Sequence, residues 1–313
     1  MSLVNTLKKR VIENKSSNLT LGWLINNFES FTINSNRNFS AGGDDGMPWH
    51  VKPIGELLFL MMVLQRNGLR TRKMAALSLK IKKEVDSFDW HQIAGFDPSS
   101  ATPMAMIADF YKMNKWPLPY EWSYFENVQA SGYLAGMDRV PYREMDLDYS
   151  LWRIGLVDDT DALVKAFSQT AFGRSQSLPK YSVDDIYSLT HAVFYLSDVG
   201  QRNVPELIGE ALSSRLNATL VELALIMTRA DNVDVLGEVL LNWLLLDIPR
   251  TGLNKTVFQA GLNRVLANMA PDGSVASTQY SYKRAIQGDA AFHELYHTTL
   301  VVTLLLHILG RKS

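Results

Sequence analysis

The chain has 313 residues, of which 47% are apolar, and this is enough for a large buried core. Its 31 lysines and arginines almost balance its 32 aspartates and glutamates, so no overall field attracts nucleic acid or an anionic membrane. The sequence contains no cysteine, which excludes disulfides, thiolate nucleophiles and cysteine-ligated metal sites. A reducing compartment fits this composition.

The first ten residues lack the apolar segment of a signal peptide. The longest apolar runs lie near residues 57–64, 239–246 and 299–309, and each is well short of the ~20 residues that a membrane span requires. We therefore expect a soluble, cytoplasmic protein with no membrane partner and no nucleic-acid partner. The sequence leaves its oligomeric state open.

Apolar residues recur with the 3.6-residue period of helices along almost the whole chain. The alternation that is typical of strands is nearly absent. The expected helices follow one another in short-linked pairs, in which a more apolar helix tends to alternate with a more charged one. They cover approximately residues 4–16, 20–33, 53–64, 70–86, 103–115, 122–134, 144–156, 158–171, 183–198, 204–215, 217–230, 232–247, 253–269 and 290–309.

This pairing predicts an all-α fold of α-hairpin repeats in a single domain over residues 1–313. If the array closes, the fold is an α/α toroid with a central cavity, and the alternative is an open α-solenoid. Two polar connections, residues 38–50 and 270–289, are long enough to act as lids over such a cavity. Their glycines lack the spacing of a phosphate-binding loop, so we expect no nucleotide cofactor.

The helix expected at residues 183–198 combines apolar sides with one polar stripe. Ser182 and Asp185 have the spacing of a capping box at its start. Because most of its other positions are apolar, the stripe indicates a buried helix that faces a polar cavity. The stripe consists of Asp184, Tyr187, Ser188, His191, Tyr195 and Asp198.

An internal repeat relates this helix to its neighbours. Residues 149–153 (Tyr-Ser-Leu-Trp-Arg) match residues 187–191 (Tyr-Ser-Leu-Thr-His) at an offset of 38. The offset aligns acidic and basic residues that lie two turns apart on one helical face, and these would line one cavity. We expect Asp146, Arg153 and Arg229 to bind the substrate, with the two arginines holding an anionic group. Alternatively, such charges only complement the helix dipoles. The aligned acids are Asp146, Asp184 and Glu222, and the aligned bases are Arg153, His191 and Arg229.

A His-Glu-x-x-His motif lies at residues 293–297. Its histidines are one helical turn apart and can bind one divalent ion, with Glu294 placed to activate water. The resemblance to zincin metalloproteases ends there, because His307 is about 15 Å further along a straight helix and cannot supply the third ligand. We instead expect His293 and His297 to meet His191 and Asp184 around zinc, iron or manganese. Alternatively, each histidine is a buried imidazole that bonds to a backbone carbonyl.

Two motifs, Tyr-x-Leu-Thr-His-x-x-Phe-Tyr-x-Ser-Asp-x-Gly at 187–200 and Phe-His-x-x-Tyr-His-Thr-Thr at 292–299, carry a wider resemblance. In them the chain resembles an uncharacterised bacterial family that is associated with natural-product biosynthesis. That family has no established activity. The resemblance implies an enzyme that tailors a specialised metabolite or its carrier-bound precursor.

Three hypotheses follow for the function. The first is a metal-dependent enzyme in which Glu294 or Tyr187 is the general acid or base and Tyr296 contacts the substrate. The second is a metal-free cyclase or isomerase that uses Asp184 and His191 as an acid–base pair. The third is a noncatalytic helical-repeat scaffold that binds a partner.

Overall fold

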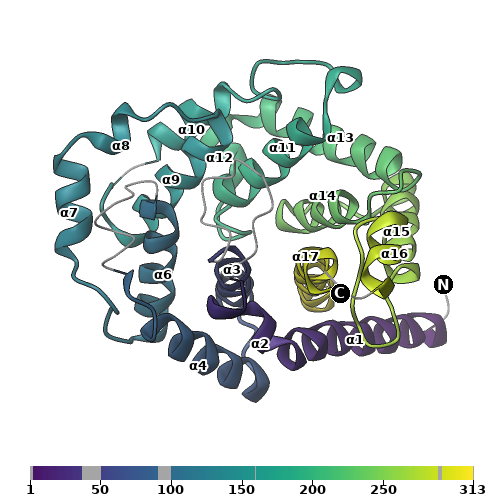
Figure 1. Ribbon diagram of the computed structural model, residues 1–313. Coiled ribbons are helices and arrows are strands. Elements are labelled where there is room, and N and C mark those ends of the chain that lie inside the picture. Colours follow the sequence, from purple (N-terminus) through teal and green to yellow (C-terminus); the bar gives the residue numbers. More distant parts are fainter. Residues whose placement is uncertain (1–2, 37–50, 91–99, 159, 288–290, 313) are drawn as a thin grey trace. The chain divides into compact units, whose positions relative to one another are not determined.

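The computed structural model describes residues 3–36, 51–90, 100–158, 160–287 and 291–312. It confirms the all-α fold class (Figure 1). The described residues form no β-strand, and one isolated bridge joins Met269 to Val275. Whether the helices form a toroid or a solenoid stays a prediction.

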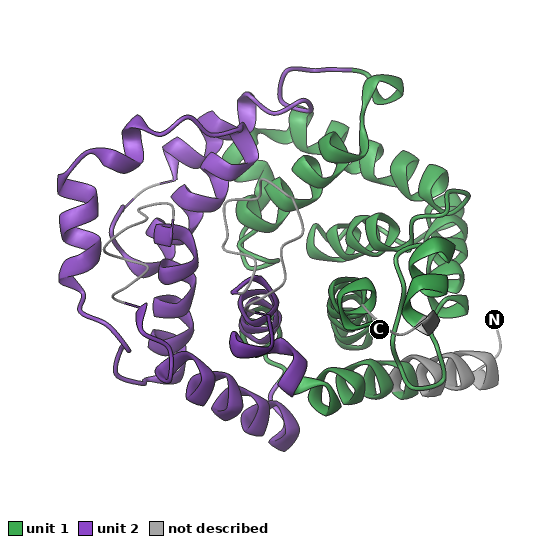
Figure 2. Ribbon diagram, in the orientation of Figure 1, with its two compact units in different colours: residues 1–28, 63–69, 177–313 green, residues 29–62, 70–176 purple. Residues whose placement is uncertain are grey.

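The chain divides into two compact units (Figure 2). Unit 1 contains Met1–Phe28, Val63–Leu69 and Ser177–Ser313, and unit 2 contains Glu29–Met62 and Arg70–Gln176. The chain passes from one unit to the other within the helix α3 (Lys52–Arg66). The single domain over residues 1–313 stays a prediction.

Partly buried polar contacts join helices of unit 2. Arg153 on α9 pairs with the buried Asp109 on α6, at 3.3 Å between Nε and Oδ2. The Tyr111 hydroxyl on α6 donates to Asp86 at the end of α4, at 2.7 Å. Unit 2 also contains the first part of α3. Its other helices after residue 31 are η1 (Asn34–Asn36), α4 (Arg72–Asp86), α6 (Ala101–Asn114), α7 (Ser123–Ala130), α8 (Tyr133–Gly136), α9 (Pro141–Ile154) and α10 (Asp161–Ser168).

Unit 1 is built around α14, all of whose residues are buried. Helices α11, α13, α15 and α17 pack against it. A helix that is apolar on nearly every side gains most when neighbours cover its whole circumference, which accounts for this central position. The elements of this unit are α1 (Leu3–Asn26), η3 (Leu178–Lys180), α11 (Val183–Leu196), α12 (Val204–Ile208), α13 (Glu210–Met227), α14 (Val233–Leu245), α15 (Gly252–Ala267), α16 (Gln279–Gln287) and α17 (Ala291–Lys312), and α2 (Phe28–Phe31) begins at its edge.

The contact between α14 and α17 depends on Gly237. A Cβ atom at this position would lie 2.9 Å from Cγ1 of Val301, so only glycine lets the two helices approach this closely. Among the described residues, α17 is also the one helix that is long and apolar enough to cross a membrane. However, 67% of its most apolar stretch is buried inside the protein, as in the core helix of a soluble protein. The cytoplasmic location stays a prediction.

The start of α11 confirms the capping box. The Ser182 hydroxyl accepts a hydrogen bond from the Asp185 backbone N–H, and the Asp185 carboxylate accepts one from the Ser182 backbone N–H. Of the two expected lids, residues 38–50 lie outside the described residues. Residues 270–289 were expected to be a connection, but α16 forms within them.

The end of α11 is a turn with left-handed backbone. Asp198 and Val199 have φ values of 44° and 50°, and such values are rare for residues other than glycine, above all for a β-branched one. Two contacts from the end of α3 hold this turn. Asn67 donates to the carbonyl of Val199 at 3.2 Å, and Arg66 pairs with Asp198 at 3.5 Å, with both side chains buried.

This buried pair should contribute strongly to stability. We expect Asp198→Asn, which keeps the side-chain shape and tolerates positive φ, to lower the free energy of unfolding by up to about 3–5 kcal/mol, because the buried Arg66 charge loses this carboxylate. Denaturant unfolding monitored by circular dichroism measures the change. Adding Arg66→Met should restore part of the loss.

Asp247 offers a matched control. It also has positive φ, at 51°, and pairs with Lys312, but its side chain is 77% exposed. Asp247→Asn should change the unfolding free energy by less than about 1 kcal/mol, as for other surface pairs. Equal effects at the two positions would contradict a special role for the Arg66–Asp198 pair.

Candidate metal centre

Helix α14 carries two buried acids one turn apart. Asp234 and Glu238 are only 3% and 2% exposed. The Asn232 side chain accepts a hydrogen bond from the backbone N–H of Val235, which fixes the first turn of the helix and therefore the place of Asp234. Burying an ionised carboxylate costs several kcal/mol unless partners compensate for the lost water. We call Asp234 and Glu238 the carboxylate pair.

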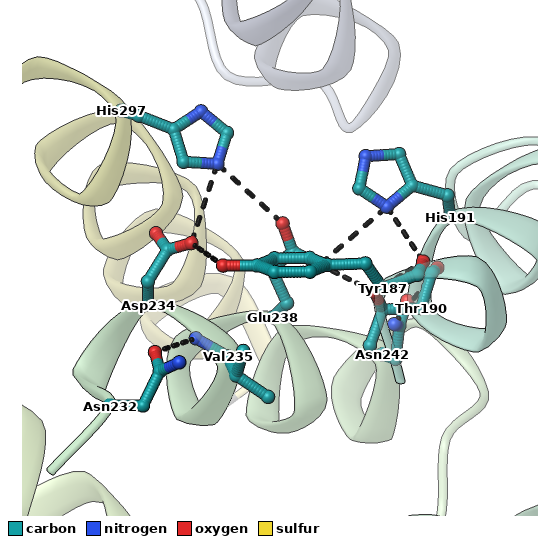
Figure 3. Close-up of polar contacts among 9 residues, drawn as sticks. All are labelled: Tyr187, Thr190, His191, Asn232, Asp234, Val235, Glu238, Asn242 and His297. Carbon is teal, nitrogen blue, oxygen red and sulfur yellow. Dashed lines mark hydrogen bonds and ion pairs between the residues drawn. The ribbon is translucent and has the colours of Figure 1, made fainter. Parts of the chain in front are cut away.

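His297 on α17 reaches over the carboxylate pair (Figure 3). Its Nε2 lies 3.6 Å from Oδ2 of Asp234 and 3.7 Å from Oε1 of Glu238. One ligand atom from each of the three residues lies within 4.8 Å of the others, so the group could hold a metal ion. The His297 side chain is 37% exposed, so the group is buried on its carboxylate side and accessible on its imidazole side.

The spacing within this group suits a shared ion. Two ligand atoms that are each about 2.1 Å from one ion at tetrahedral angles lie about 3.4 Å apart. The observed separations are close to this value and longer than the roughly 2.7–3.2 Å of an N–H···O hydrogen bond. In addition, Oδ1 of Asp234 is buried and accepts no well-aligned hydrogen bond from the described residues, although the Thr298 hydroxyl on α17 lies close enough to lower the pKa of this acid. An incompletely satisfied buried carboxylate calls for an explanation, and a metal ion supplies one.

Helix α11 provides hydrogen bonds behind the carboxylate pair. The Tyr187 hydroxyl donates to Oδ2 of Asp234 at 2.6 Å, and the Thr190 hydroxyl donates to Oε2 of Glu238. His191 places its Nδ1 3.7 Å from the same Oε2 atom. Such contacts orient metal ligands and commonly change metal affinity 10- to 100-fold when they are removed.

The environment separates the pKa values of the carboxylate pair. Burial, together with the charge of Glu238, raises the pKa of Asp234 against the opposing influence of His297. Burial acts in the same direction on Glu238, but His191 and His297 outweigh it, so the pKa of Glu238 lies below its ordinary value. Burial and the adjacent Asp234 also raise the pKa of Tyr187, so this phenol stays protonated and acts as a donor.

A family model described as Domain of unknown function (DUF6895) matches residues 17–307, which is most of the chain. The chain belongs to this family. No curated protein and no solved structure is significantly similar to it. All the residues of the candidate metal centre in this DUF6895 protein lie within the matched range.

The site residues predicted on α11 are in different environments. Tyr187 and His191 both face α14, where they contact Asp234 and Glu238. Asp184 is exposed in the first turn of the helix. The acid that His191 approaches at 3.7 Å is Glu238 rather than Asp184.

The residues predicted on α17 also separate. The group of three contains one of the expected metal ligands, His297. His293, His191 and Asp184 are not part of any such group among the described residues. His293 is half-buried, and burial lowers its pKa. Glu294 pairs with Arg284 on α16 at 2.9 Å. Tyr296 is buried, and its ring stacks on Phe292 with 5.0 Å between the centroids.

The remaining predicted residues are not part of the group of three. Asp146 and Arg153 belong to unit 2, where Asp146 lies 3.6 Å from Arg143 and Arg153 pairs with Asp109. Arg229 belongs to unit 1 and is exposed in the turn that follows α13. The role of these residues in substrate binding stays a prediction.

Two residues of the candidate centre, Asp234 and Glu238, were missed in the sequence. Their signal was present, because they are acids at positions i and i+4 of a helix whose other residues are, except for Asn242, apolar or glycine. A same-face pair of acids within such a helix cannot reach water and needs a buried partner. That partner lies 59 residues further along the chain, at His297, where local spacing gives no indication of it.

The geometry predicts which substitutions remove a metal ion. We expect the protein, purified without a histidine tag and reconstituted with zinc, iron or manganese, to retain about one ion per chain. His297→Ala and Glu238→Gln should lose most of it, because each removes one of three ligands. Elemental analysis after gel filtration measures the content.

His293→Ala is the matched control, because it removes the same type of side chain one turn earlier on the same helix. It should retain the ion. Loss of the ion in His293→Ala and its retention in Glu238→Gln would contradict the centre described here.

Proposed function

We propose that this DUF6895 protein is a metal-dependent enzyme whose ion is bound by Asp234, Glu238 and His297. The observation that carries the proposal is a buried carboxylate pair that faces a half-exposed histidine. Structural metal sites usually have four protein ligands, whereas catalytic sites have three and keep a position for water or substrate. Three ligands that are accessible from one side are typical of the catalytic type.

The donor set narrows the choice of ion. Two carboxylate oxygens and one imidazole nitrogen suit zinc, iron or manganese better than they suit copper, which prefers softer or more nitrogen-rich sites. An ion of this kind, when bound, lowers the pKa of a bound water or polarises a substrate oxygen.

His191 and Tyr187 would assist next to the ion. Nδ1 of His191 faces two acceptors, the carbonyl of Tyr187 at 2.8 Å and Oε2 of Glu238 at 3.7 Å. An acceptor cannot supply a proton, so Nδ1 carries the hydrogen, and Nε2 of the neutral ring is left as the proton-accepting nitrogen. The Tyr187 hydroxyl holds Asp234 in place through its 2.6 Å hydrogen bond.

For the substrate, we propose a small specialised metabolite or its carrier-bound precursor, processed in the cytoplasm. The support is the resemblance of the motifs at 187–200 and 292–299 to a family associated with natural-product biosynthesis. The first motif contains Tyr187, Thr190 and His191, and the second contains His297. One of the three proposed ligands, His297, thus lies in these motifs together with the three residues of α11 that contact the carboxylate pair, whereas Asp234 and Glu238 lie outside both motifs.

A metal-free cyclase or isomerase is the second candidate. One observation favours it: the surroundings raise the pKa of Asp234 and lower the pKa of Glu238. Two acids whose pKa values are pushed apart can act as a general acid and a general base. In this candidate, the carboxylate pair replaces the Asp184–His191 pair expected from the sequence.

The accessibility of the ion provides one test. We expect the iron(II)-loaded protein to bind nitric oxide and to give the electron paramagnetic resonance signal of a high-spin iron–nitrosyl, because three protein ligands leave positions on the ion open. His297→Ala, which lacks the ion, should give no such signal. A wild-type protein that binds iron tightly but no nitric oxide would have a closed, structural site, and the enzymatic proposal would be wrong.

The reaction can be approached through the host. We expect deletion of the gene to change the mass-spectrometric profile of small metabolites and the wild-type gene to restore it. Glu238→Gln should not restore it, whereas His293→Ala should. Restoration by Glu238→Gln would separate the biological function from this centre.

The same host cells distinguish the two candidates. If the metal-dependent proposal holds, the purified protein should convert the compound that accumulates in the deletion strain. A chelator should abolish this activity, and the ion should restore it. Activity that is indifferent to chelators would select the metal-free acid–base enzyme.

A further inference from the structure

The two oxygens of Glu238 have different neighbours. Oε1 faces His297, at 3.7 Å from its Nε2. Oε2 faces α11, where it accepts the hydrogen bond of the Thr190 hydroxyl and lies 3.7 Å from Nδ1 of His191. Figure 3 shows the two histidines on either side of this carboxylate. Only Oε1 therefore points to the place where Asp234 and His297 converge.

The single proton of Thr190 can be assigned by counting donors. Its hydroxyl lies 3.0 Å from the carbonyl of Tyr187, the usual acceptor for a threonine in a helix, as well as near Oε2 of Glu238. The carbonyl of Tyr187 already faces Nδ1 of His191 at 2.8 Å. A carboxylate is the stronger acceptor, so the Thr190 proton goes to Glu238 in a charge-assisted hydrogen bond.

Thr190 is itself held against α14. Its side chain is fully buried, and its carbonyl accepts a hydrogen bond from Nδ2 of Asn242 at 3.0 Å. Asn242 lies one turn after Glu238 on α14 and is also fully buried. The Thr190–Glu238 contact and the Asn242–Thr190 contact thus both join α11 to α14. Together they fix the orientation of the Glu238 carboxylate.

We propose that Thr190 is a positioning residue that restricts Glu238 to one-oxygen binding and thereby selects a small transition-metal ion against calcium. The inference rests on the proposed metal-dependent function and adds a source of selectivity to it. Calcium takes six to eight oxygen ligands at about 2.3–2.6 Å and often binds both oxygens of a carboxylate. Zinc, iron and manganese accept fewer ligands, including an imidazole nitrogen, at shorter distances. Holding Oε2 away from the ion removes the ligand that calcium needs.

The test compares manganese and calcium binding in the full chain. Free Mn²⁺ is measured by electron paramagnetic resonance while the protein is titrated with Mn²⁺, and Ca²⁺ is then added as the competitor. We expect Thr190→Val, which keeps the side-chain shape and removes the hydroxyl, to reduce the preference for Mn²⁺ over Ca²⁺ by about 10-fold or more. Thr190→Ser should restore the preference, because it restores the hydroxyl.

Thr303→Val is the matched control. Thr303 is a fully buried threonine on α17 whose hydroxyl donates to the carbonyl of Thr299 at 2.7 Å. Removing this hydroxyl also removes a buried hydrogen bond but leaves Glu238 untouched, so the preference for Mn²⁺ should stay at the wild-type value. A loss of preference in Thr303→Val equal to that in Thr190→Val would overturn the positioning role.

A second measurement uses the wild-type protein alone and does not depend on the folding of a variant. Infrared difference spectra on addition of Mn²⁺ report the splitting of the carboxylate stretches, which is wider for one-oxygen than for two-oxygen binding. A two-oxygen splitting in every carboxylate band that Mn²⁺ changes would overturn the inference, because Glu238 is one of the two carboxylates that would contact the ion. If the wild-type protein binds none of zinc, iron and manganese, the proposed function fails. If it binds them but Thr190→Val keeps the wild-type preference, only the role of Thr190 fails.

Discussion

The burial of two carboxylates on one helix is the constraint on which the centre of unit 1 depends. Asp234 and Glu238 lie on a helix that four other helices cover, so water cannot compensate for their charge. The ion pairs that they form among the described residues are with histidines, which carry a full charge only when protonated. Hydroxyl groups of α11 supply further contacts. Each of these groups is placed by a helix that packs on α14.

Helix geometry explains why the groups converge. Tyr187 contacts Asp234 and Thr190 contacts Glu238, so the contacts advance along α11 and α14 in the same direction. His297 lies in the second turn of α17, level with the first two turns of α14. The candidate centre is thus at the N-terminal ends of both helices. The positive end of each helix dipole favours negative charge there, which offsets part of the cost of burying Asp234.

The sequence was sufficient to predict the fold class and part of the centre. The 3.6-residue period, the capping box at Ser182 and the polar side of α11 are local features, and the structure confirms them. The His-Glu-x-x-His motif predicted the candidate centre less well, because only its second histidine, His297, contacts α14. His293 instead packs beside the aromatic rings of Phe292 and Tyr296. Contacts between α14 and α17 depend on how the chain folds over about 60 residues. No periodicity within either helix encodes them.

Stability alone does not account for the carboxylate pair. In other proteins, replacing a buried ionic cluster by apolar residues of similar volume is often neutral or stabilising by about 1–4 kcal/mol. Most neighbours of Asp234 and Glu238 on α14 are valines and leucines, so apolar side chains at these two positions would extend an existing core. A core of that kind would leave no buried oxygen without a partner, whereas here Oδ1 of Asp234 accepts no well-aligned hydrogen bond from the described residues. A bound cation would resolve this conflict, since it would neutralise both acids and draw on the imidazole that faces them.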